Sequence, residues 1–147
     1  VKKLDRRPVM LTDSGELSWW VRAANRGDIF GTTMYRWVWN EMVGSYKYPI
    51  PPAFFRVKER LTRLFVGQKK PFIVIELQAE PWTHKQIYET PLAEQLKLMP
   101  LSEVSETIDY AKQTGFSDYY LWGVEWWYYL RQNSHPEYWD YIKNLVK

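Results

Sequence analysis

The sequence predicts an α/β protein built around a parallel β-sheet. Four short apolar segments, rich in β-branched or aromatic residues, alternate with segments whose apolar residues recur at helical spacing. Strands that alternate with helices in this way form parallel sheets through right-handed crossovers. The 147 residues suit one domain, and a hydrophobic content of 46% supplies enough side chains for a core.

The first strand–helix unit lies near the amino terminus. We expect a strand over residues 7–12, where Pro8 fixes an extended entry, and a polar turn over residues 13–16. Ser14 is a suitable N-cap for the helix that follows, in which apolar residues recur every three or four positions. Gly27 is the expected end of this helix.

The second unit begins with an expected strand over residues 28–35, followed by an aromatic loop over residues 36–52. The double proline that closes this loop opens a helix, which Gly67 ends. The helix carries one apolar stripe, the pattern typical of a helix that packs against a core: Phe54, Val57, Leu61, Leu64 and Phe65. Its basic residues are then predicted to form a solvated face.

The third unit contains the most informative strand. An apolar, β-branched run starts at Pro71, as in a strand buried on both faces, and it ends in carboxylates, an amide and an indole over residues 76–82. We expect a long polar loop over residues 83–100 and then a helix over residues 102–115.

The fourth unit has an expected strand over residues 118–123, which exits into an aromatic segment over residues 124–129. Ser134 and Glu137 have the spacing of a capping box. They predict the start of a last helix whose apolar residues continue to Leu145.

Polar and aromatic side chains cluster after all four predicted strands. Because the carboxyl ends of parallel strands meet at one edge, we expect a shared site there. Aromatic residues make up 18% of the chain, with nine Trp and eleven Tyr. This excess favours surfaces that stack on flat ligands such as sugar rings, nucleobases or a partner protein.

Two short motifs make the chain similar to the carboxyl-terminal half of a (β/α)8-barrel glycoside hydrolase. They are Ile73-Val74-Ile75-Glu76-Leu77-Gln78 and Tyr120-Leu121-Trp122-Gly123. The likeness is to the clan of family-five cellulases and mannanases and family-42 β-galactosidases. It implies a parallel (βα)4 half-barrel over residues 1–147, with its strand–helix units corresponding to units five to eight of a TIM barrel and the N-terminal half outside this chain.

The resemblance also implies catalytic roles. Glu76 corresponds to the nucleophile of a retaining enzyme acting on β-linked oligo- or polysaccharides, and Tyr35 to a tyrosine that hydrogen-bonds and orients it. Trp122 corresponds to the floor of the sugar site. Enzymes of this kind take their acid/base from the end of strand four, which would precede Val1. The isolated chain is therefore expected to be inactive or weakly active.

Glu41, preceded by Asn40, resembles an acid/base motif but lies only 35 residues before Glu76. Two complete strand–helix units would have to fit in that gap, and one needs about 30 residues. The spacing therefore favours a loop position for Glu41.

Other residues at the strand exits are candidates for substrate binding: Asp13, Arg36, Trp37, Gln78, Glu80, Trp82, Glu125 and Trp126. Some alternatives remain open at this point. Gln78 is expected either to contact a sugar hydroxyl or to bond Glu76, and Glu125 either to contact sugar or to hold a basic side chain. Arg36 is expected either to pair with Glu76 or to lie on the surface.

The composition argues against several other kinds of site. The chain has no cysteine, and its two histidines stand alone, so we expect no metal site. No phosphate-binding glycine motif occurs, so we expect no cofactor. The net charge of +3, with no apolar run of transmembrane length, predicts no nucleic-acid or membrane partner. The compartment is left open.

Two alternatives to the enzyme hypothesis remain. One is a non-catalytic carbohydrate-binding protein, in which the carboxylates only accept hydrogen bonds from sugar hydroxyls. The other is a half-barrel assembly fragment. Its exposed sheet edges would pair with the missing N-terminal half-barrel or with a second copy as a homodimer. The chain begins at Val1 without an initiator methionine, which also suggests a piece of a longer protein.

Overall fold

The computed structural model describes residues 3–67 and 69–146. Its helices and strands follow one another in this order: β1 (Met10–Asp13), α1 (Trp20–Arg26), β2 (Ile29–Met34), β3 (Trp37–Asn40), β4 (Gly44–Lys47), α2 (Pro52–Val66), β5 (Phe72–Gln78), the 3-10 turn η1 (Ile87–Glu89), α3 (Leu92–Leu98), α4 (Leu101–Lys112), β6 (Tyr119–Trp122), α5 (Val124–Gln132) and α6 (Glu137–Leu145).

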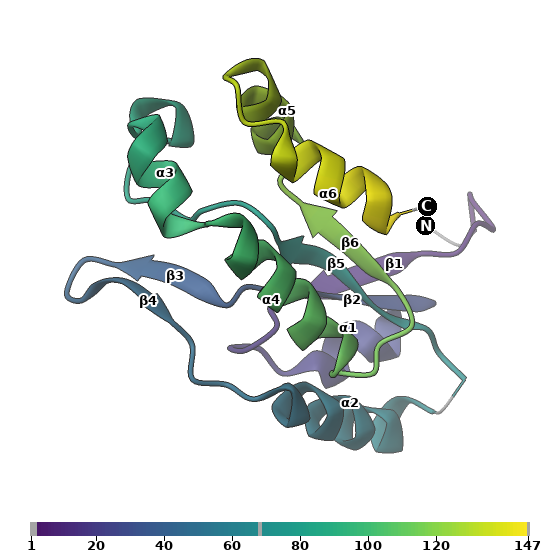
Figure 1. The fold of residues 1–147 in the computed structure, drawn as a ribbon. Helices are drawn as coiled ribbons and strands as arrows, with labels where there is room; N and C mark the ends of the chain where they lie inside the picture. The colour runs from purple at the N-terminus through teal and green to yellow at the C-terminus, as the bar shows by residue number, and fades with distance from the viewer. Residues whose placement is uncertain (1–2, 68, 147) are drawn as a thin grey trace. The chain divides into compact units, whose positions relative to one another are not determined.

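Four of the strands form one parallel sheet in the order β1-β2-β5-β6, and helices separate them along the chain (Figure 1). The predicted α/β class and the parallel sheet are therefore confirmed. In the register, Phe30 of β2 lies between Leu11 of β1 and Phe72 of β5. Their side chains consequently share one face of the sheet, since paired residues of parallel strands point to the same side.

The chain divides into two compact units. The first consists of the residues up to Tyr35 together with Pro49–Leu77 and Tyr110–Tyr120, and the second of Arg36–Tyr48, Gln78–Asp109 and the residues from Leu121 onward.

The core of the first unit is an aromatic cluster centred on Trp20 of α1. The ring of Trp20 lies 5.3 Å from Phe30, 6.2 Å from Phe55 and 6.1 Å from Phe116. Phe30 in turn lies 5.0 Å from Phe72 of the neighbouring strand. Rings at these separations bury large apolar areas and interlock at offset or edge-on angles, which fixes α1 and α2 against one face of the sheet.

A β-bulge in β5 changes the direction of the residues that follow it. Thr32 pairs with Val74 and Thr33 pairs with Glu76, so Ile75 is an extra residue without a counterpart in β2. The extra residue turns Glu76 to the side of the sheet occupied by Thr33. Gly31 lies on that side too, where an added Cβ would come 2.7 Å from the Ile75 side chain.

The core of the second unit includes α5 and α6, which pack against each other (Figure 1). Trp126, Trp127 and Leu130 of α5 are buried, as are Tyr138 and Ile142 of α6. The polar ends of the rings are satisfied, because Trp127 donates to the Ala79 carbonyl (2.7 Å) and Tyr138 to the Met99 carbonyl (3.0 Å). A buried indole or phenol donor that lacked an acceptor would destabilise the fold.

Three segments expected to be irregular are regular instead. The segment expected to be an aromatic loop contains the antiparallel hairpin of β3 and β4, in which Val38 pairs with Tyr46 and Gly44, at φ 72°, supports the turn. The expected polar loop over residues 83–100 contains η1 and α3. The aromatic segment after the fourth strand is α5, whose buried residues recur at helical spacing.

The predicted capping box does not form. Ser134 adopts a left-handed backbone conformation with φ 68°, and α6 begins after Pro136 without a side-chain cap. The Glu137 carboxylate instead lies 3.1 Å from Nδ1 of His135.

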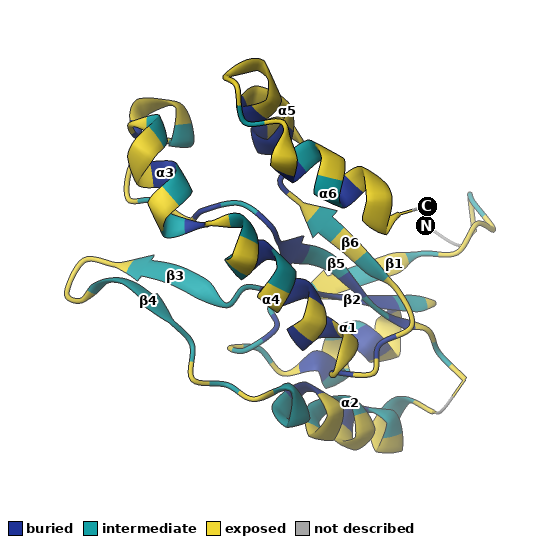
Figure 2. Cartoon of the chain, in the orientation of Figure 1, coloured by how far each residue is buried: buried dark blue, intermediate teal, exposed yellow. Residues whose placement is uncertain are grey.

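The apolar stripe of α2 does not face the core. Only Phe55 and Thr62 of this helix are buried, whereas most of the stripe is exposed (Figure 2). The side chain of Arg63 helps to explain this orientation. Its guanidinium lies 4.3 Å from the Phe72 ring, bonds Glu59 and donates to the Lys70 carbonyl at 2.7 Å, so an arginine occupies a place where an apolar residue was expected.

Candidate functional site

In the first unit, the candidate nucleophile Glu76 accepts a hydrogen bond from Tyr35. The phenol oxygen of Tyr35 lies 2.9 Å from Oε2 of Glu76, and both side chains are half-buried. Tyr35 follows β2 directly, and Glu76 lies near the carboxyl end of the neighbouring β5. The bond engages one of the two carboxylate oxygens and fixes the orientation of the carboxylate plane.

The bulge in β5 accounts for this pairing. If β5 continued without the bulge, Ile75 would pair with Thr33, and strand alternation would direct Glu76 toward the same face as Phe72 and Val74, which are buried. With the bulge, Glu76 lies opposite Thr33, two residues before Tyr35. Bulges commonly redirect a side chain next to an active site.

Glu16 is a further acidic residue of the first unit that the sequence did not single out as a site residue. Burial raises the pKa of its carboxyl, and hydrogen bonds from its own backbone N–H and from that of Tyr35 oppose this rise, as does the charge of Lys58. Glu16 therefore holds the backbone of the residue whose side chain bonds Glu76. Asp13, a predicted site residue, caps the adjacent turn by accepting from the Ser14 N–H at 3.0 Å.

In the second unit, Trp122 and Glu80 are joined by a hydrogen bond. The indole N–H of Trp122, a residue that is 49% exposed, donates to Oε1 of Glu80 at 2.9 Å. Gly123 permits the close approach of their two segments. Its backbone has φ 139°, and an added Cβ would come 2.9 Å from the Ala79 carbonyl oxygen. A residue with a side chain would therefore separate the turn from the segment that carries Glu80.

Glu80 and Glu125 line a pocket of about 220 Å³ in the second unit, with Tyr88, Gln95, Trp126 and Tyr129 among its other walls. Burial raises the pKa of Glu80, the negative charge of Glu125 raises it further, and the hydrogen bond from Trp122 opposes both effects. A pocket with aromatic walls and two carboxyls can accept hydrogen bonds from several hydroxyl groups of a ligand.

Trp126 contributes a buried wall to this pocket. Only 3% of it is exposed, and its indole N–H donates to the Gln95 side chain at 2.8 Å. The sequence did not identify Tyr88, Gln95 or Tyr129. The helical spacing of Glu125 and Tyr129, which places them on one face of α5, could have identified the last of these.

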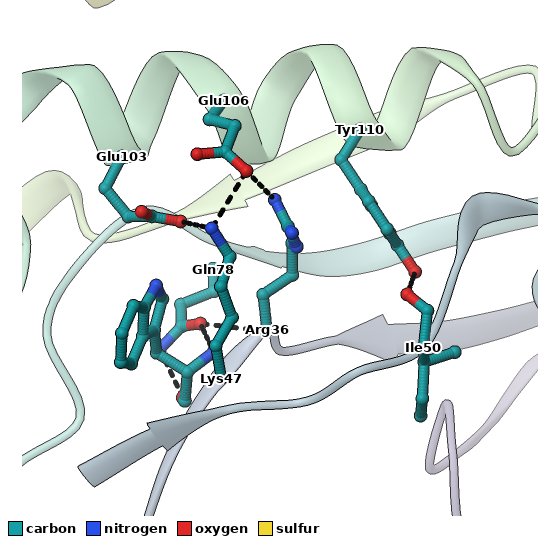
Figure 3. A network of polar contacts seen from close by, with 8 residues as sticks. Arg36, Lys47, Ile50, Gln78, Glu103, Glu106 and Tyr110 are labelled. Atoms are coloured by element: carbon teal, nitrogen blue, oxygen red, sulfur yellow. Dashed lines mark hydrogen bonds and ion pairs between the residues drawn. The ribbon is translucent and has the colours of Figure 1, made fainter.

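Gln78 is completely buried and anchors the hairpin of the second unit (Figure 3). Its amide oxygen accepts from the backbone N–H groups of Arg36 and Trp37 at 3.0 and 2.8 Å, and its amide nitrogen donates to the Trp37 carbonyl at 2.8 Å. The two backbone donors occupy both acceptor positions of the amide oxygen, so this oxygen has no place left for a sugar hydroxyl. In the structure, Gln78 therefore positions the start of β3.

Arg36 belongs to an ion-pair network beside this anchor (Figure 3). Its guanidinium lies 3.1 Å from Glu106, and the ammonium of Lys47 contacts both Glu103 (2.7 Å) and Glu106 (2.9 Å). Hydrogen bonds from Lys47 and Arg36 lower the pKa of Glu106. The Lys47 ammonium also lies 5.6 Å from the ring of Trp37, so the predicted site residues Arg36 and Trp37 both contribute to holding the hairpin.

Trp82 keeps 47% of its surface exposed. Over residues 3–67 and 69–146, no group of three or more histidine, cysteine, aspartate or glutamate side chains is arranged to hold a metal ion. The same residues contain no helix long and apolar enough to span a bilayer.

The chain matches no protein-family model, and no curated protein or solved structure shows significant similarity to it.

Proposed function

We propose that the protein is a retaining glycoside hydrolase for β-linked oligo- or polysaccharides, and that this chain carries its nucleophile. The hydrogen bond between Tyr35 and Glu76, near the carboxyl ends of adjacent parallel strands, is the observation that supports this proposal most directly. In this proposal the four strands are strands five to eight of a (β/α)8 barrel, and the first half of the barrel lies on another segment or chain.

In the proposed mechanism, Glu76 attacks the anomeric carbon and forms a covalent glycosyl-enzyme while the bond to the departing oxygen breaks. Tyr35 holds the attacking carboxylate in orientation. A second carboxyl, about 5 to 5.5 Å from the first in retaining enzymes, protonates the departing oxygen and later activates water. We assign this second carboxyl to the half of the barrel that is outside the chain.

The second unit offers carbohydrate contacts of its own. Trp122 offers a partly exposed indole face on which a pyranose ring stacks, and Glu80 and Glu125 accept hydrogen bonds from its hydroxyl groups. The hydrogen bond from Trp122 to Glu80 holds both side chains in one arrangement before the ligand arrives.

The pocket of the second unit also supports a second candidate, a carbohydrate-binding protein without catalysis. Glu76→Gln distinguishes the two, because an amide is a poor nucleophile of nearly the same shape. Dinitrophenyl β-glycosides are suitable substrates, since dinitrophenolate leaves without protonation. The enzyme predicts that E76Q abolishes the release of dinitrophenolate while calorimetry still detects oligosaccharide binding. Equal release by E76Q and wild type would refute the catalytic role.

A further inference from the structure

The first unit has an exposed apolar surface over α2 and the turn that leads into α1, and the two helices pack side by side (Figure 1). We call it the α1–α2 apolar surface. Its residues and their exposed fractions are Leu17 (81%), Trp19 (88%), Val57 (53%), Leu61 (54%), Leu64 (73%) and Phe65 (72%). Single exposed apolar residues are ordinary, but a group gathered on α2 and the neighbouring turn before α1 indicates a binding surface.

The four residues of this surface that belong to α2 form one continuous stripe. Val57, Leu61 and Leu64 are separated by four and three positions, so they lie along the same side of the helix, and Phe65 adjoins Leu61. These residues do not face the interior, because Phe55 and Thr62 occupy the buried side of α2. The stripe therefore faces outward along the length of the helix.

The exposed charged side chains of α1 and α2 are basic. Arg56 and Arg60 are exposed on α2, and Arg22 and Arg26 are exposed on α1. Within these two helices, both fully described, Glu59 is the single acidic residue, and it is paired with Arg63 at 2.7 Å. A surface with this combination of apolar and basic side chains complements a partner that is both apolar and negatively charged.

A recess of about 420 Å³ lies within this surface, between α1 and α2. Its walls include Trp20, Phe54, Leu61 and Phe65. The ammonium of Lys58, which also lines the recess, donates to the Gly15 carbonyl at 2.6 Å and lies 4.5 Å from the Trp20 ring. Glu16 also lines the recess, and its carboxylate carries the charge opposite to that of Lys58. These contacts compensate the charge of Lys58 internally, so the rest of the recess is suited to receive an apolar group.

We propose that the α1–α2 apolar surface binds peripherally to anionic lipid membranes. The side chains of Trp19, Leu64 and Phe65 enter the boundary between the head groups and the acyl chains, and the exposed arginines contact lipid phosphates and carboxylates. Surface-binding helices combine tryptophan, phenylalanine and leucine with basic residues in this way. A polybasic segment is attracted by the negative surface potential of such membranes.

Charge also favours an anionic membrane over a second copy of the chain as the partner of this surface. Two copies related by a two-fold axis would place the same arginine rim against itself, and like charges oppose that contact. The inference differs from the expectation drawn from the sequence, which predicted no membrane partner and a solvated basic face. The solvated face was expected because the apolar stripe of α2 was placed toward the core, and the structure exposes the stripe instead. The absence of a membrane partner was expected from the net charge and from the lack of an apolar run of transmembrane length.

The test is sedimentation of the chain with vesicles of phosphatidylcholine alone and with vesicles containing about one-third phosphatidylserine. Binding is expected only to the anionic vesicles and is expected to weaken with salt. The double variant R56Q/R60Q removes two surface cations and is expected to weaken binding about 30-fold. L64S/F65S is expected to abolish binding. R131Q and V146S change exposed residues of the second unit and serve as matched controls that bind like wild type.

Several results would overturn the proposal. The first is the absence of binding to anionic vesicles by a chain whose circular dichroism shows that it is folded. The second is binding that L64S/F65S leaves unchanged, which would mean that no apolar side chain enters the lipid. The third is a dimer, seen by light scattering, that L64S/F65S converts to a monomer while vesicles have no effect; the occupant would then be a second copy.

Discussion

Replacing Tyr35 by phenylalanine removes one oxygen atom and with it the hydrogen bond to Glu76. The ring keeps its shape, so the change isolates the effect of the phenol on the carboxylate. A hydrogen bond to a charged group contributes about 1.5 to 3 kcal/mol. If the whole of this free energy serves to orient the attacking carboxylate, Y35F should slow the formation of the glycosyl-enzyme by a factor of roughly 10 to 150.

The assay is the burst of dinitrophenolate from an activated β-glycoside, whose rate reports the glycosylation step separately from the slower turnover. Tyr120→Phe is the matched control, because Tyr120 is 59% exposed and belongs to the same unit. It should leave the burst rate unchanged. A Y35F burst within a factor of two of wild type would refute the orienting role of Tyr35.

Three further predictions concern the second unit. Gly123→Ala should lower the free energy of unfolding by about 2 kcal/mol or more in urea titrations, because its φ is 139° and its Cβ would meet the Ala79 carbonyl; an unchanged midpoint would contradict this. Gln78→Ala should cost about 3 kcal/mol, since it leaves buried backbone groups without partners, whereas the exposed Gln132→Ala should cost almost nothing. The raised pKa of Glu80 gives stability that is present below its unfolded pKa and is lost as the pH rises through the folded value. As the pH rises from 4 to 7, the free energy of unfolding of E80Q should therefore increase relative to that of wild type. A difference between the two proteins that stays constant over this range would contradict the prediction.

The sheet was predictable because its strands carry strong local signals. The β-branched run that leads into Glu76 forms β5, and the double proline and Gly67 bound α2 closely. Alternation of such strands with helices leaves few topologies other than a parallel sheet. These signals act over a few residues and do not depend on distant packing.

The failures have a different cause. The amphipathic pattern of α2 shows that the helix has an apolar side, but it does not show what that side faces. In the structure, Phe55 and Thr62 occupy the buried side of the helix, and an arginine packs on Phe72. The hairpin of β3 and β4 depends on the Gln78 anchor, which comes from a segment some forty residues later in the chain. No local pattern carries that information.

The candidate site likewise has one part that the sequence predicted and another that it did not. The pairing of Tyr35 with Glu76 was implied by resemblance to a family, and the hydrogen bond is present. The bulge at Ile75 that makes it possible has no signature in the sequence. The raised pKa values of Glu16 and Glu80 likewise arise from burial, which the sequence does not specify.

The central claim, that Glu76 is a glycosidase nucleophile, is tested most directly by covalent trapping. Dinitrophenyl 2-deoxy-2-fluoro-β-glycosides of glucose, galactose and mannose need no protonation of the departing oxygen, and the fluorine slows hydrolysis of the glycosyl-enzyme. Mass spectrometry of the treated chain should show the addition of one fluorosugar, and peptide mapping should place it on Glu76, with no addition to E76Q. Labelling at another residue, or no labelling of the folded chain by any of the three reagents, would contradict the proposed function.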